Sequence, residues 1–199
     1  MAMPITTELA EIEHALAQGE LVGLPTDTVY GLACLASRRD SCEAIFVRKG
    51  RPDDLALPVL VADLDQALTV VSVASDDFLA AASLWPGPLT IVTERAQELH
   101  WRLGGDEQSV GIRCPDHELV RTLARRLGPL AVTSANPHRE PPAQSARGCE
   151  ELFGDLLVYD GGSCDGEPST VVSLTDGAVK FLRVGSIDEE AIRSTIANG

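Results

Sequence analysis

The chain has 199 residues, of which 44% are hydrophobic and 23% are charged. These values are ordinary for a globular protein of one domain, and they exclude the disordered, collagen-like and coiled-coil classes. The 16 Lys and Arg against 30 Asp and Glu leave a net charge of −14, which disfavours a protein that holds nucleic acid mainly by neutralising its phosphates.

The chain also lacks the features of an exported or membrane-bound protein. No apolar run approaches the roughly 18 residues of a membrane span, and no basic stretch followed by an apolar core stands at the N-terminus. The five cysteines are an odd number without a C-x-x-C pair, which favours free thiols in a reducing compartment. We therefore expect one cytoplasmic domain over residues 1–199, with no membrane association.

Predicted helices and strands alternate over most of the chain. Amphipathic spacing predicts helices over residues 7–18, 41–50, 75–84, 116–127 and 145–153, and a last short helix from about 188. We expect Ser41 and Asp116 to cap two of these helices. Short apolar runs predict strands over residues 21–24, 59–62, 89–92, 109–113, 130–133 and 156–159.

A hairpin is predicted near the end of the chain. Its strands, residues 170–174 and 178–183, flank the turn sequence Thr175-Asp176-Gly177. Early alternation followed by a late hairpin predicts an α/β fold. We expect a twisted, open sheet with mixed parallel and antiparallel strands and with helices packed on it.

Polar residues gather where the predicted strands end, which is where open α/β sheets bind ligands. The first cluster, Pro25-Thr26-Asp27-Thr28-Val29-Tyr30-Gly31-Leu32, is a hydroxyl-rich loop that follows an apolar strand. On spacing alone it is equally well a capped turn, because Thr and Asp side chains bond locally to the backbone. Both interpretations stay open.

The second cluster, Arg48-Lys49-Gly50-Arg51-Pro52, places three cations within four residues of an otherwise acidic chain. If the chain extends after its helix, Lys49 and Arg51 point to the same side and can clamp a phosphate or a carboxylate. A solvated helix end is the alternative, since cations suit a helix C-terminus. A solvated helix end explains less well why Pro52, which restricts the backbone, directly follows the pair of Lys49 and Arg51.

A third pair and three single residues complete the set. Ser134 and Asn136 share one face if the chain stays extended up to Pro137, and a hydroxyl and a carboxamide can bind a phosphate, a ribose or an amino acid. A strand-ending turn is the alternative for this pair. Three more polar side chains stand at strand ends: Arg113, Ser169 and Arg183. Together, these strand ends indicate one shared site.

The motifs of the common nucleotide, metal and esterase sites are missing. The chain has no G-x-x-x-x-G-K-[ST], no G-x-G-x-x-G and no G-x-S-x-G. Its four histidines lack metal-ligand spacing, so we expect no protein metal site. The residues alone therefore predict a polyanion-binding cleft on a mixed α/β sheet.

Seven short motifs, in chain order, carry a family resemblance: residues 24–32, 49–52, 85–90, 110–113, 134–136, 168–172 and 182–185. They resemble the YrdC-type threonylcarbamoyl-AMP synthase family in its short, single-domain form, over nearly the whole chain. The resemblance implies a YrdC-like sheet with a concave, locally positive face. It also implies a nucleotidyltransferase that makes L-threonylcarbamoyl-AMP and pyrophosphate from L-threonine, bicarbonate or CO₂, and ATP.

The resemblance assigns roles residue by residue. The family's K-x-R and S-x-N catalytic tetrad matches Lys49, Arg51, Ser134 and Asn136. Its threonine- or nucleotide-contacting positions match Thr28, Arg113, Ser169 and Arg183. The chain departs after K-x-R, because it has Leu55-Ala56-Leu57 where many members read Asn-Pro-Leu, and Leu60 where they have a histidine. The loss of these polar contacts bears on threonine affinity more than on reaction class.

The resemblance also implies partners. Mg²⁺ is expected with ATP rather than in a dedicated protein site, and a threonylcarbamoyl transferase complex would carry the product's group to an adenosine of tRNA. A competing hypothesis is a non-catalytic member that binds double-stranded RNA or tRNA, against which the net charge of −14 argues. A carbamoyl-transferring relative, as in hydrogenase maturation, and a member without synthase activity also stay open as hypotheses.

Overall fold

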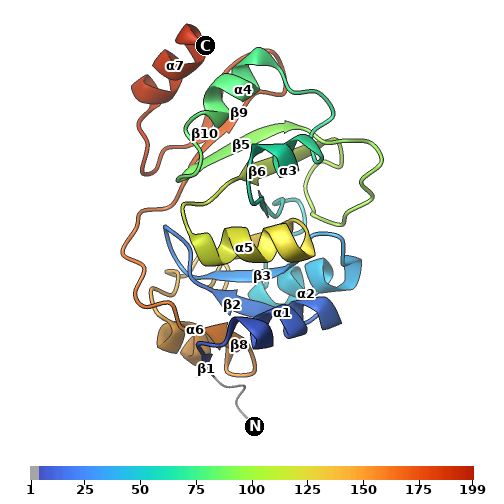
Figure 1. Cartoon of the computed structure of the whole chain (residues 1–199), viewed down its shortest axis with the longest axis vertical. Helices are drawn as coiled ribbons and strands as arrows, with labels where there is room; N and C mark the ends of the chain where they lie inside the picture. The colour runs from blue at the N-terminus through green and yellow to red at the C-terminus, as the bar shows by residue number, and fades with distance from the viewer. Residues whose placement is uncertain (1–4) are drawn as a thin grey trace.

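The structure is a computed structural model that describes residues 5–199. Its strands form one sheet in the order β1-β8-β2-β3-β7-β4-β6-β5-β9-β10 (Figure 1). The strands are β1 (Ile5–Thr6), β2 (Val22–Leu24), β3 (Gly31–Leu35), β4 (Val59–Leu60), β5 (Leu89–Glu94), β6 (Ser109–Arg113), β7 (Leu130–Ser134), β8 (Leu157–Tyr159), β9 (Thr170–Ser173) and β10 (Lys180–Arg183). Four neighbouring pairs are parallel and five are antiparallel, which confirms the predicted mixed, open sheet.

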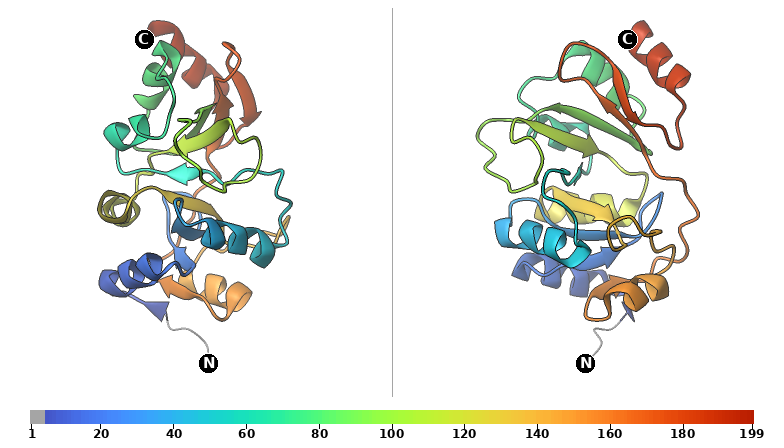
Figure 2. Two further views of the ribbon diagram at one scale, coloured as in Figure 1. Left: turned by 90° about the vertical axis from the view of Figure 1, so that its right-hand side faces the viewer. Right: turned by 180° about the vertical axis from the view of Figure 1, so that it is seen from behind.

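Helices lie on both faces of this sheet. The helices of the described residues are α1 (Leu9–Gln18), α2 (Arg39–Lys49), α3 (Leu64–Leu68), α4 (Asp76–Ala82), α5 (Glu118–Leu127), α6 (Ala146–Phe153) and α7 (Glu189–Asn198). The left view of Figure 2 shows α1 and α5 on one side of the sheet and α2 and α6 on the other. None of these helices has the length and hydropathy needed to cross a lipid bilayer.

Strand β3 shows how side-chain alternation divides the core. Ala33 and Leu35 pack in the cluster formed with α1 and α5, whereas Leu32 packs with α6 and Cys34 with α2. Successive strand residues point to opposite faces of a sheet. Because all five residues of β3 are buried, this strand fixes the position of the loop of residues 25–30 that precedes it.

Most predicted helix and strand boundaries hold within a few residues, and the capping residues explain why. Helix α1 ends at Gly19, whose φ of 86° is readily adopted by glycine. The hydroxyls of Ser75 and Ser145 accept hydrogen bonds from the backbone N–H of Phe78 (3.2 Å) and Gly148 (3.1 Å), which begins α4 and α6. The hairpin prediction is confirmed by the antiparallel pairing of β9 with β10.

The two predicted caps at Ser41 and Asp116 are wrong. Helix α2 already begins at Arg39, so Ser41 lies within its first turn, where its hydroxyl donates to Gly19 O at 2.6 Å. Helix α5 begins after His117, and no side chain caps it. In both cases the first turn is closed by the backbone alone, through Cys42 N–H to Arg38 O and Arg121 N–H to His117 O.

Three elements have no counterpart among the predicted ones: β1, β3 and α3. Strand β3 contains Gly31 and Ala33, which have low strand propensity, and its first residues belong to the polar cluster that the sequence indicates as a loop. Helix α3 spans five residues, too few for a periodic pattern. Strand β3 is stabilised by its neighbours β2 and β7, whereas α3 has a local cap, since Asp63 Oδ1 accepts from Gln66 N–H at 2.9 Å.

Candidate active site

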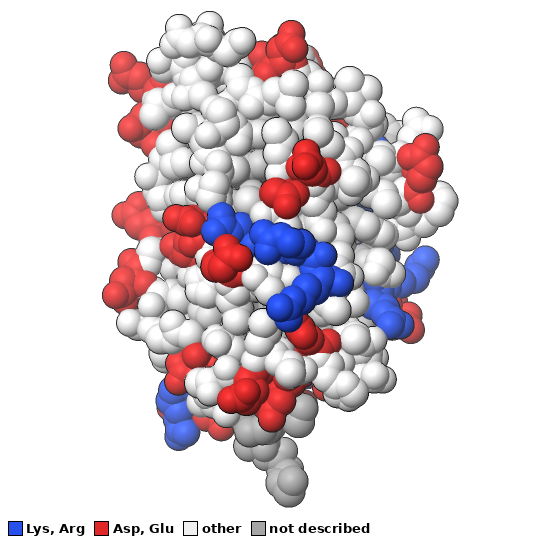
Figure 3. Space-filling model, in the orientation of Figure 1, with Lys and Arg blue, Asp and Glu red and all other residues white. Residues whose placement is uncertain are grey.

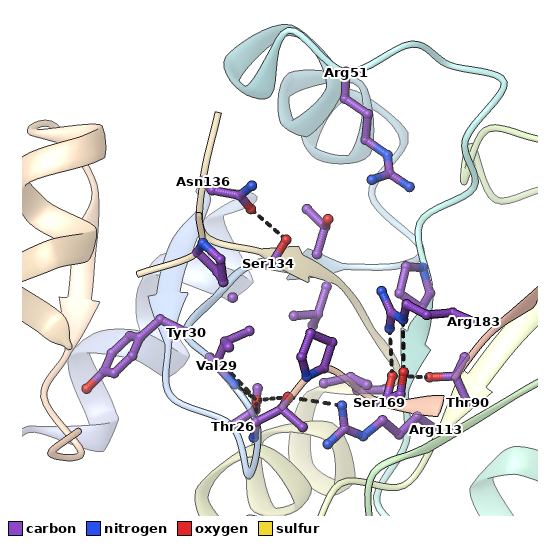
Figure 4. A pocket seen from close by; sticks show the side chains of 18 of the residues that line it. Thr26, Val29, Tyr30, Arg51, Thr90, Arg113, Ser134, Asn136, Ser169 and Arg183 are labelled. Atoms are coloured by element: carbon purple, nitrogen blue, oxygen red, sulfur yellow. Dashed lines mark hydrogen bonds between the residues drawn. The ribbon is translucent and has the colours of Figure 1, made fainter. Parts of the chain in front are cut away.

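A cleft of about 320 Å³ lies over the middle of the sheet. It collects seven of the eight predicted site residues: Thr28, Arg51, Arg113, Ser134, Asn136, Ser169 and Arg183. Figure 4 shows Arg51 and Asn136 on one side of this pocket and Arg113 and Ser169 on the other. Strand ends far apart in the chain therefore do converge on one site.

The cleft crosses the sheet instead of following one of its edges. Strand β7 runs antiparallel to β4, with Leu130 opposite Leu60, whereas β6 runs parallel to β4, with Arg113 opposite the same Leu60. Arg113 is therefore level with the first residue of β7, and Ser134 lies at the other end of that strand. Leu60 and Val132 lie in the lining between the two ends, so the strand ends that meet at the cleft come from both ends of the strands.

The loop of residues 25–30 connects these two ends. The hydroxyl oxygen of Thr26 accepts hydrogen bonds from the backbone N–H of Thr28 (3.1 Å) and Val29 (3.2 Å), and the hydroxyl donates to Val29 O. This local bonding is the capped turn that the sequence also allowed. The turn nevertheless faces the cleft, and Thr28 Oγ1 accepts a bond from Arg113 Nη1 at 3.2 Å.

Arg113 is held rigidly at its end of the cleft. It is 6% exposed, and its guanidinium donates to Asp27 Oδ1 at 2.6 Å and to Gly87 O at 3.1 Å. A buried charge is tolerated when it is paired and hydrogen-bonded. Asp27 is not among the predicted site residues, although it stands in the polar loop that the sequence singles out.

Arg183 lies beside Ser169 and close to Arg113. Its guanidinium donates to Ser169 O at 2.9 Å and to Ser169 Oγ at 3.0 Å, and Ser169 Oγ is 3.0 Å from Thr90 Oγ1. Burial and the positive charge of Arg113 lower the pKa of Arg183. Because Asp27 pairs with Arg113 and the ligands of Arg183 are neutral oxygens, the charge left at this end is positive and favours an anionic ligand.

Lys49 does not line the cleft. Helix α2 continues to Lys49, and Gly50 then turns the chain with a φ of 59°, so residues 49–51 do not extend and the expected clamp of Lys49 beside Arg51 is wrong. Lys49 is 4% exposed. Its ammonium group donates to Ser134 O (2.5 Å), Asn136 O (2.6 Å) and Asn136 Oδ1 (3.0 Å). It therefore fixes the wall that carries Ser134 and Asn136.

Arg51 faces the cleft from the segment that follows α2 (Figure 4). Its guanidinium donates to Leu55 O at 3.1 Å and to Ala56 O at 2.9 Å. Leu55 and Ala56 depart from the family pattern in their side chains, but their backbone carbonyls still accept the hydrogen bonds of Arg51. Leu60, at the position of the family's histidine, lies in the lining as an apolar group.

The remaining lining residues include two polar side chains that the sequence did not assign, Thr90 and Glu140. Thr90 lies in a motif that carried the family resemblance, so its position was a usable signal. Glu140 follows a turn after Asn136, and nothing in its local sequence indicates a place in the cleft.

Outside the cleft, the positive charges on the face shown in Figure 3 are largely paired. A band of Lys and Arg lies at the level of α5, with Asp and Glu spread around it (Figure 3). Arg121 contacts Glu118 within α5 at 2.9 Å, and Arg126 of α5 contacts Glu13 of α1 at 2.6 Å. This face is not the broad, unpaired basic surface that phosphate-driven RNA binding needs.

The fold and the cleft define a class: an α/β domain that binds a small anionic ligand between loops of a mixed sheet. Comparisons with known proteins narrow this class. The Sua5/YciO/YrdC family model, described as "Telomere recombination", matches residues 14–185. The threonylcarbamoyl-AMP synthase of Bacillus subtilis is 34% identical over 195 residues, which cover 95% of this chain and 56% of that protein.

One more curated relative and one solved structure indicate the same family. The threonylcarbamoyl-AMP synthase of Homo sapiens is 37% identical over 92% of this chain and 67% of its own length. A crystal structure of P. abyssi Sua5 complexed with L-threonine superposes with a TM-score of 0.88 at 32% identity, over 94% of this chain and 57% of that one. The chain spans little more than half of the B. subtilis and P. abyssi proteins. It belongs to the Sua5/YciO/YrdC family.

Proposed function

We propose that the protein is a threonylcarbamoyl-AMP synthase, which forms L-threonylcarbamoyl-AMP and pyrophosphate from L-threonine, bicarbonate and ATP. The observation that carries the proposal is the grouping of Arg51, Arg113 and Arg183 on one cleft with Asp27 as the paired carboxylate. A site with surplus positive charge suits a reaction between two anions. Family membership and the names of the relatives support the same reaction.

The end of the cleft around Arg113 suits the amino acid. A guanidinium binds a carboxylate through paired hydrogen bonds, and Asp27 holds this one in a fixed orientation. The hydroxyls of Thr28 and Ser169 lie in the same lining and can accept from an amine or donate to a carboxylate. We assign L-threonine to this end.

The end around Ser134, Asn136 and Arg51 suits the nucleotide. The hydroxyl of Ser134 donates to Asn136 Oδ1 at 2.6 Å, and the cation of Lys49 lies directly behind both residues. Arg51 supplies a guanidinium that faces the cleft. We assign the phosphates of ATP to Ser134, Asn136 and Arg51, and we assign Lys49 a positioning role rather than contact with the substrate.

The chemistry needs charge neutralisation and alignment more than a covalent catalyst. The amine of threonine and bicarbonate give a carbamate and water. A carbamate oxygen then attacks the α-phosphorus, and the bond to the β-phosphate breaks to release pyrophosphate. Both the attacking and the leaving group are anionic, so fixed guanidiniums lower their repulsion and hold them in line. Arg113, with Arg183 beside it, would hold the carbamate-bearing amino acid while Arg51 faces the phosphates.

Magnesium enters this scheme as part of the MgATP substrate. Glu140 is the carboxylate of the lining, and within residues 5–199 no group of three or more His, Cys, Asp or Glu is placed to hold a metal ion. This donor set fits an ion held mainly by phosphate oxygens and water, with Glu140 as its protein ligand. The ion would neutralise charge on the departing pyrophosphate.

The product is a mixed anhydride, which hydrolyses readily, so a partner must take it up. We propose a threonylcarbamoyl transferase complex that passes the group to an adenosine of tRNA in the cytoplasm. The protein itself needs no extended RNA surface for this role. A gel-shift with tRNA at physiological salt separates this proposal from the RNA-binding hypothesis, which requires a stable complex without ATP turnover.

The decisive experiment supplies ATP, ¹³C-bicarbonate and one amino acid at a time, and measures pyrophosphate release together with the mass of the adenylate. We expect a labelled threonylcarbamoyl adenylate that depends on all three substrates. Arg51→Ala should abolish pyrophosphate release, and Arg39→Gln, at the other end of α2, should not change it. Pyrophosphate release that needs no amino acid, or none with any amino acid, would rule the proposed function out.

A further inference from the structure

Arg139 combines two unusual features. Among residues 5–199 it is the non-glycine residue with a positive φ, 69°. It is also exposed. Of the 16 Lys and Arg, Arg139 is the one whose side chain makes no hydrogen bond or ion pair with the described residues. Each of the other 15 has a polar partner. An unpaired cation is notable in a chain of net charge −14.

The positive φ belongs to a tight turn. The N–H of Glu140 donates to Pro137 O at 3.0 Å, so Arg139 is the third residue of a β-turn. A positive φ at that place defines a type II turn, in which glycine or asparagine is the usual residue because a larger side chain crowds the backbone. Arg139 therefore occupies a position where its side chain carries a conformational cost.

The surrounding contacts hold the turn in this shape. The carboxamide of Asn136 donates to Pro137 O (3.0 Å) and Glu140 O (2.5 Å), and His138 N–H donates to Lys49 O (2.8 Å). Backbone strain persists where neighbouring structure over-determines it, and such residues concentrate at ligand sites. Here the neighbours are the residues that form the nucleotide end of the cleft.

Arg139 is not itself a lining residue, but the turn brings its backbone next to the cleft lining. Asn136 and Glu140, on either side of it, are both lining residues, and consecutive α-carbons are only about 3.8 Å apart. Arg51 and Arg183 already donate to protein oxygens. The guanidinium of Arg139 retains all five N–H donors, and its planar fork suits a phosphate.

We propose that Arg139 binds the terminal phosphates of the nucleotide at the mouth of the cleft and, after the reaction, the pyrophosphate product. The assignment of the nucleotide as ATP rests on the proposed function. The binding of a polyphosphate group does not require turnover. Arg139 then meets the end of the triphosphate from the Asn136 side, while Arg51 meets it from the segment after α2.

Calorimetric titrations with inorganic tripolyphosphate, ATP and AMP test this proposal. In Arg139→Gly, which removes the cation and relieves the backbone, affinity for tripolyphosphate and ATP should fall about tenfold, as expected for a lost charge-assisted contact, and affinity for AMP should stay within about twofold. Arg139→Asn, which also tolerates a positive φ, should match it. Arg139→Lys should retain part of the affinity. Arg39→Gln is the matched control for loss of an exposed charge.

The thermal midpoint supplies an independent readout. Loss of a residue that stabilises the fold would lower the midpoint, whereas we expect Arg139→Gly to unfold at the same or a higher temperature than the parent protein, because glycine accepts the turn without strain. The loss of phosphate affinity should also shrink at high salt, because the contact is exposed.

Several results would overturn the proposal. The first is that the parent protein does not bind tripolyphosphate detectably, and the second is that Arg139→Gly binds it as tightly as the parent. The third is that Arg139→Gly loses as much affinity for AMP as for tripolyphosphate. The fourth is that Arg139→Gly binds tRNA more weakly while its tripolyphosphate binding is intact. Failure of the proposed function is distinguishable from these. A parent protein that makes no threonylcarbamoyl adenylate, but whose tripolyphosphate affinity depends on Arg139, refutes the reaction and leaves the phosphate site standing.

Discussion

The ammonium group of Lys49 donates to two oxygens of Asn136, the backbone carbonyl at 2.6 Å and the side-chain Oδ1 at 3.0 Å. Helix α2 thereby fixes the end of strand β7 from behind. The side-chain oxygen that Lys49 holds also accepts from the hydroxyl of Ser134. The orientation of this cleft wall therefore depends on a cation that does not itself line the cleft.

Lys49→Met should damage the nucleotide end of the cleft more than the amino-acid end. Methionine fills a similar volume but leaves the acceptors of Ser134 and Asn136 without their donor, at a cost of about 1–3 kcal/mol. We expect kcat/KM for ATP to fall by roughly 100-fold and KM for threonine to change little. Steady-state kinetics with each substrate varied in turn measure the split. Equal losses for both substrates would contradict the positioning role, and Lys49→Gln, which keeps an N–H donor without the charge, gives a second variant if Lys49→Met does not fold.

Lys49 should also give the enzyme an alkaline limit. Burial and the charge of Arg51 lower the pKa of Lys49 to about 8, so above that pH its amine has two N–H groups for three acceptors and the wall loosens. The ratio of kcat/KM for the parent protein to that for Lys49→Met should fall as pH rises through about 8. The amine of free threonine titrates identically in both assays and cancels in the ratio. A ratio that stays flat from about pH 7 to 9.5 contradicts this prediction, since that range brackets the shifted pKa.

The same shift has a defined sign for stability. An unfolded lysine keeps its proton up to about pH 10.4, whereas folded Lys49 releases it near 8. Between these values the unfolded chain binds more protons, so the free energy of unfolding attributable to Lys49 rises with pH. Denaturant titrations at about pH 7.5 and 9.5, on either side of the folded pKa, measure the free energy of unfolding of the parent protein and of Lys49→Met. The value for the parent protein relative to that for Lys49→Met should rise between the two pH values, although activity declines over the same range.

Asp27→Asn should destabilise the protein through Arg113. The two side chains are 7% and 13% exposed and their charged atoms are 2.6 Å apart, so the amide leaves a buried guanidinium without its counter-charge, at a cost of about 3–5 kcal/mol. Inorganic phosphate, by replacing that charge, should raise the thermal midpoint of the variant more than that of the parent protein. The control is Asp53→Asn, which breaks an exposed pair with Arg102 at 3.0 Å and should cost less than about 1 kcal/mol. Equal destabilisation by the two variants would refute the prediction.

Much of the site could be predicted because its residues stand next to strong local signals. Arg113 and Arg183 each end an apolar run, and the hydroxyls of the 25–30 loop follow another, so a strand delivers each of them to a strand end. The helix boundaries at Gly19 and Ser75 likewise follow from backbone chemistry that is local in sequence. Such signals need no knowledge of distant partners.

The remaining features depend on contacts between distant parts of the chain. Lys49 turns inward to acceptors 85 and 87 residues away, and no local pattern distinguishes it from a cation at a solvated helix end. The ion pair of Asp27 with Arg113 spans 86 residues. The direction of β7 relative to β6, which sends the cleft across the sheet, is set by the register of β4 with both strands.

Tyr30 ties the cleft loop to a segment more than 130 residues further along the chain. Its buried hydroxyl donates to Gly162 O at 2.7 Å and accepts from Gly161 N–H at 3.2 Å. Tyr30→Phe removes both hydrogen bonds, but Gly161 and Gly162 are exposed and can bond to water instead. We therefore expect a cost of about 0.5–1.5 kcal/mol and a fall in the thermal midpoint of about 2–4 °C for each kcal/mol. Tyr159→Phe, whose half-buried hydroxyl has no hydrogen bond within residues 5–199, should shift it by less than about 1 °C.

Titration of the two tyrosines tests the same contact from the ionised side. Burial raises the pKa of Tyr30 to about 12, whereas an unfolded tyrosine ionises near 10. The stabilisation by this hydroxyl is therefore complete below about pH 10 and is lost as pH rises through about 12. Ultraviolet difference spectra of the parent protein should show a phenolate forming near pH 12 that is missing in Tyr30→Phe. If the phenolate that Tyr30→Phe lacks instead forms near pH 10, the ordinary value for a tyrosine, the Tyr30 hydroxyl is not held as described.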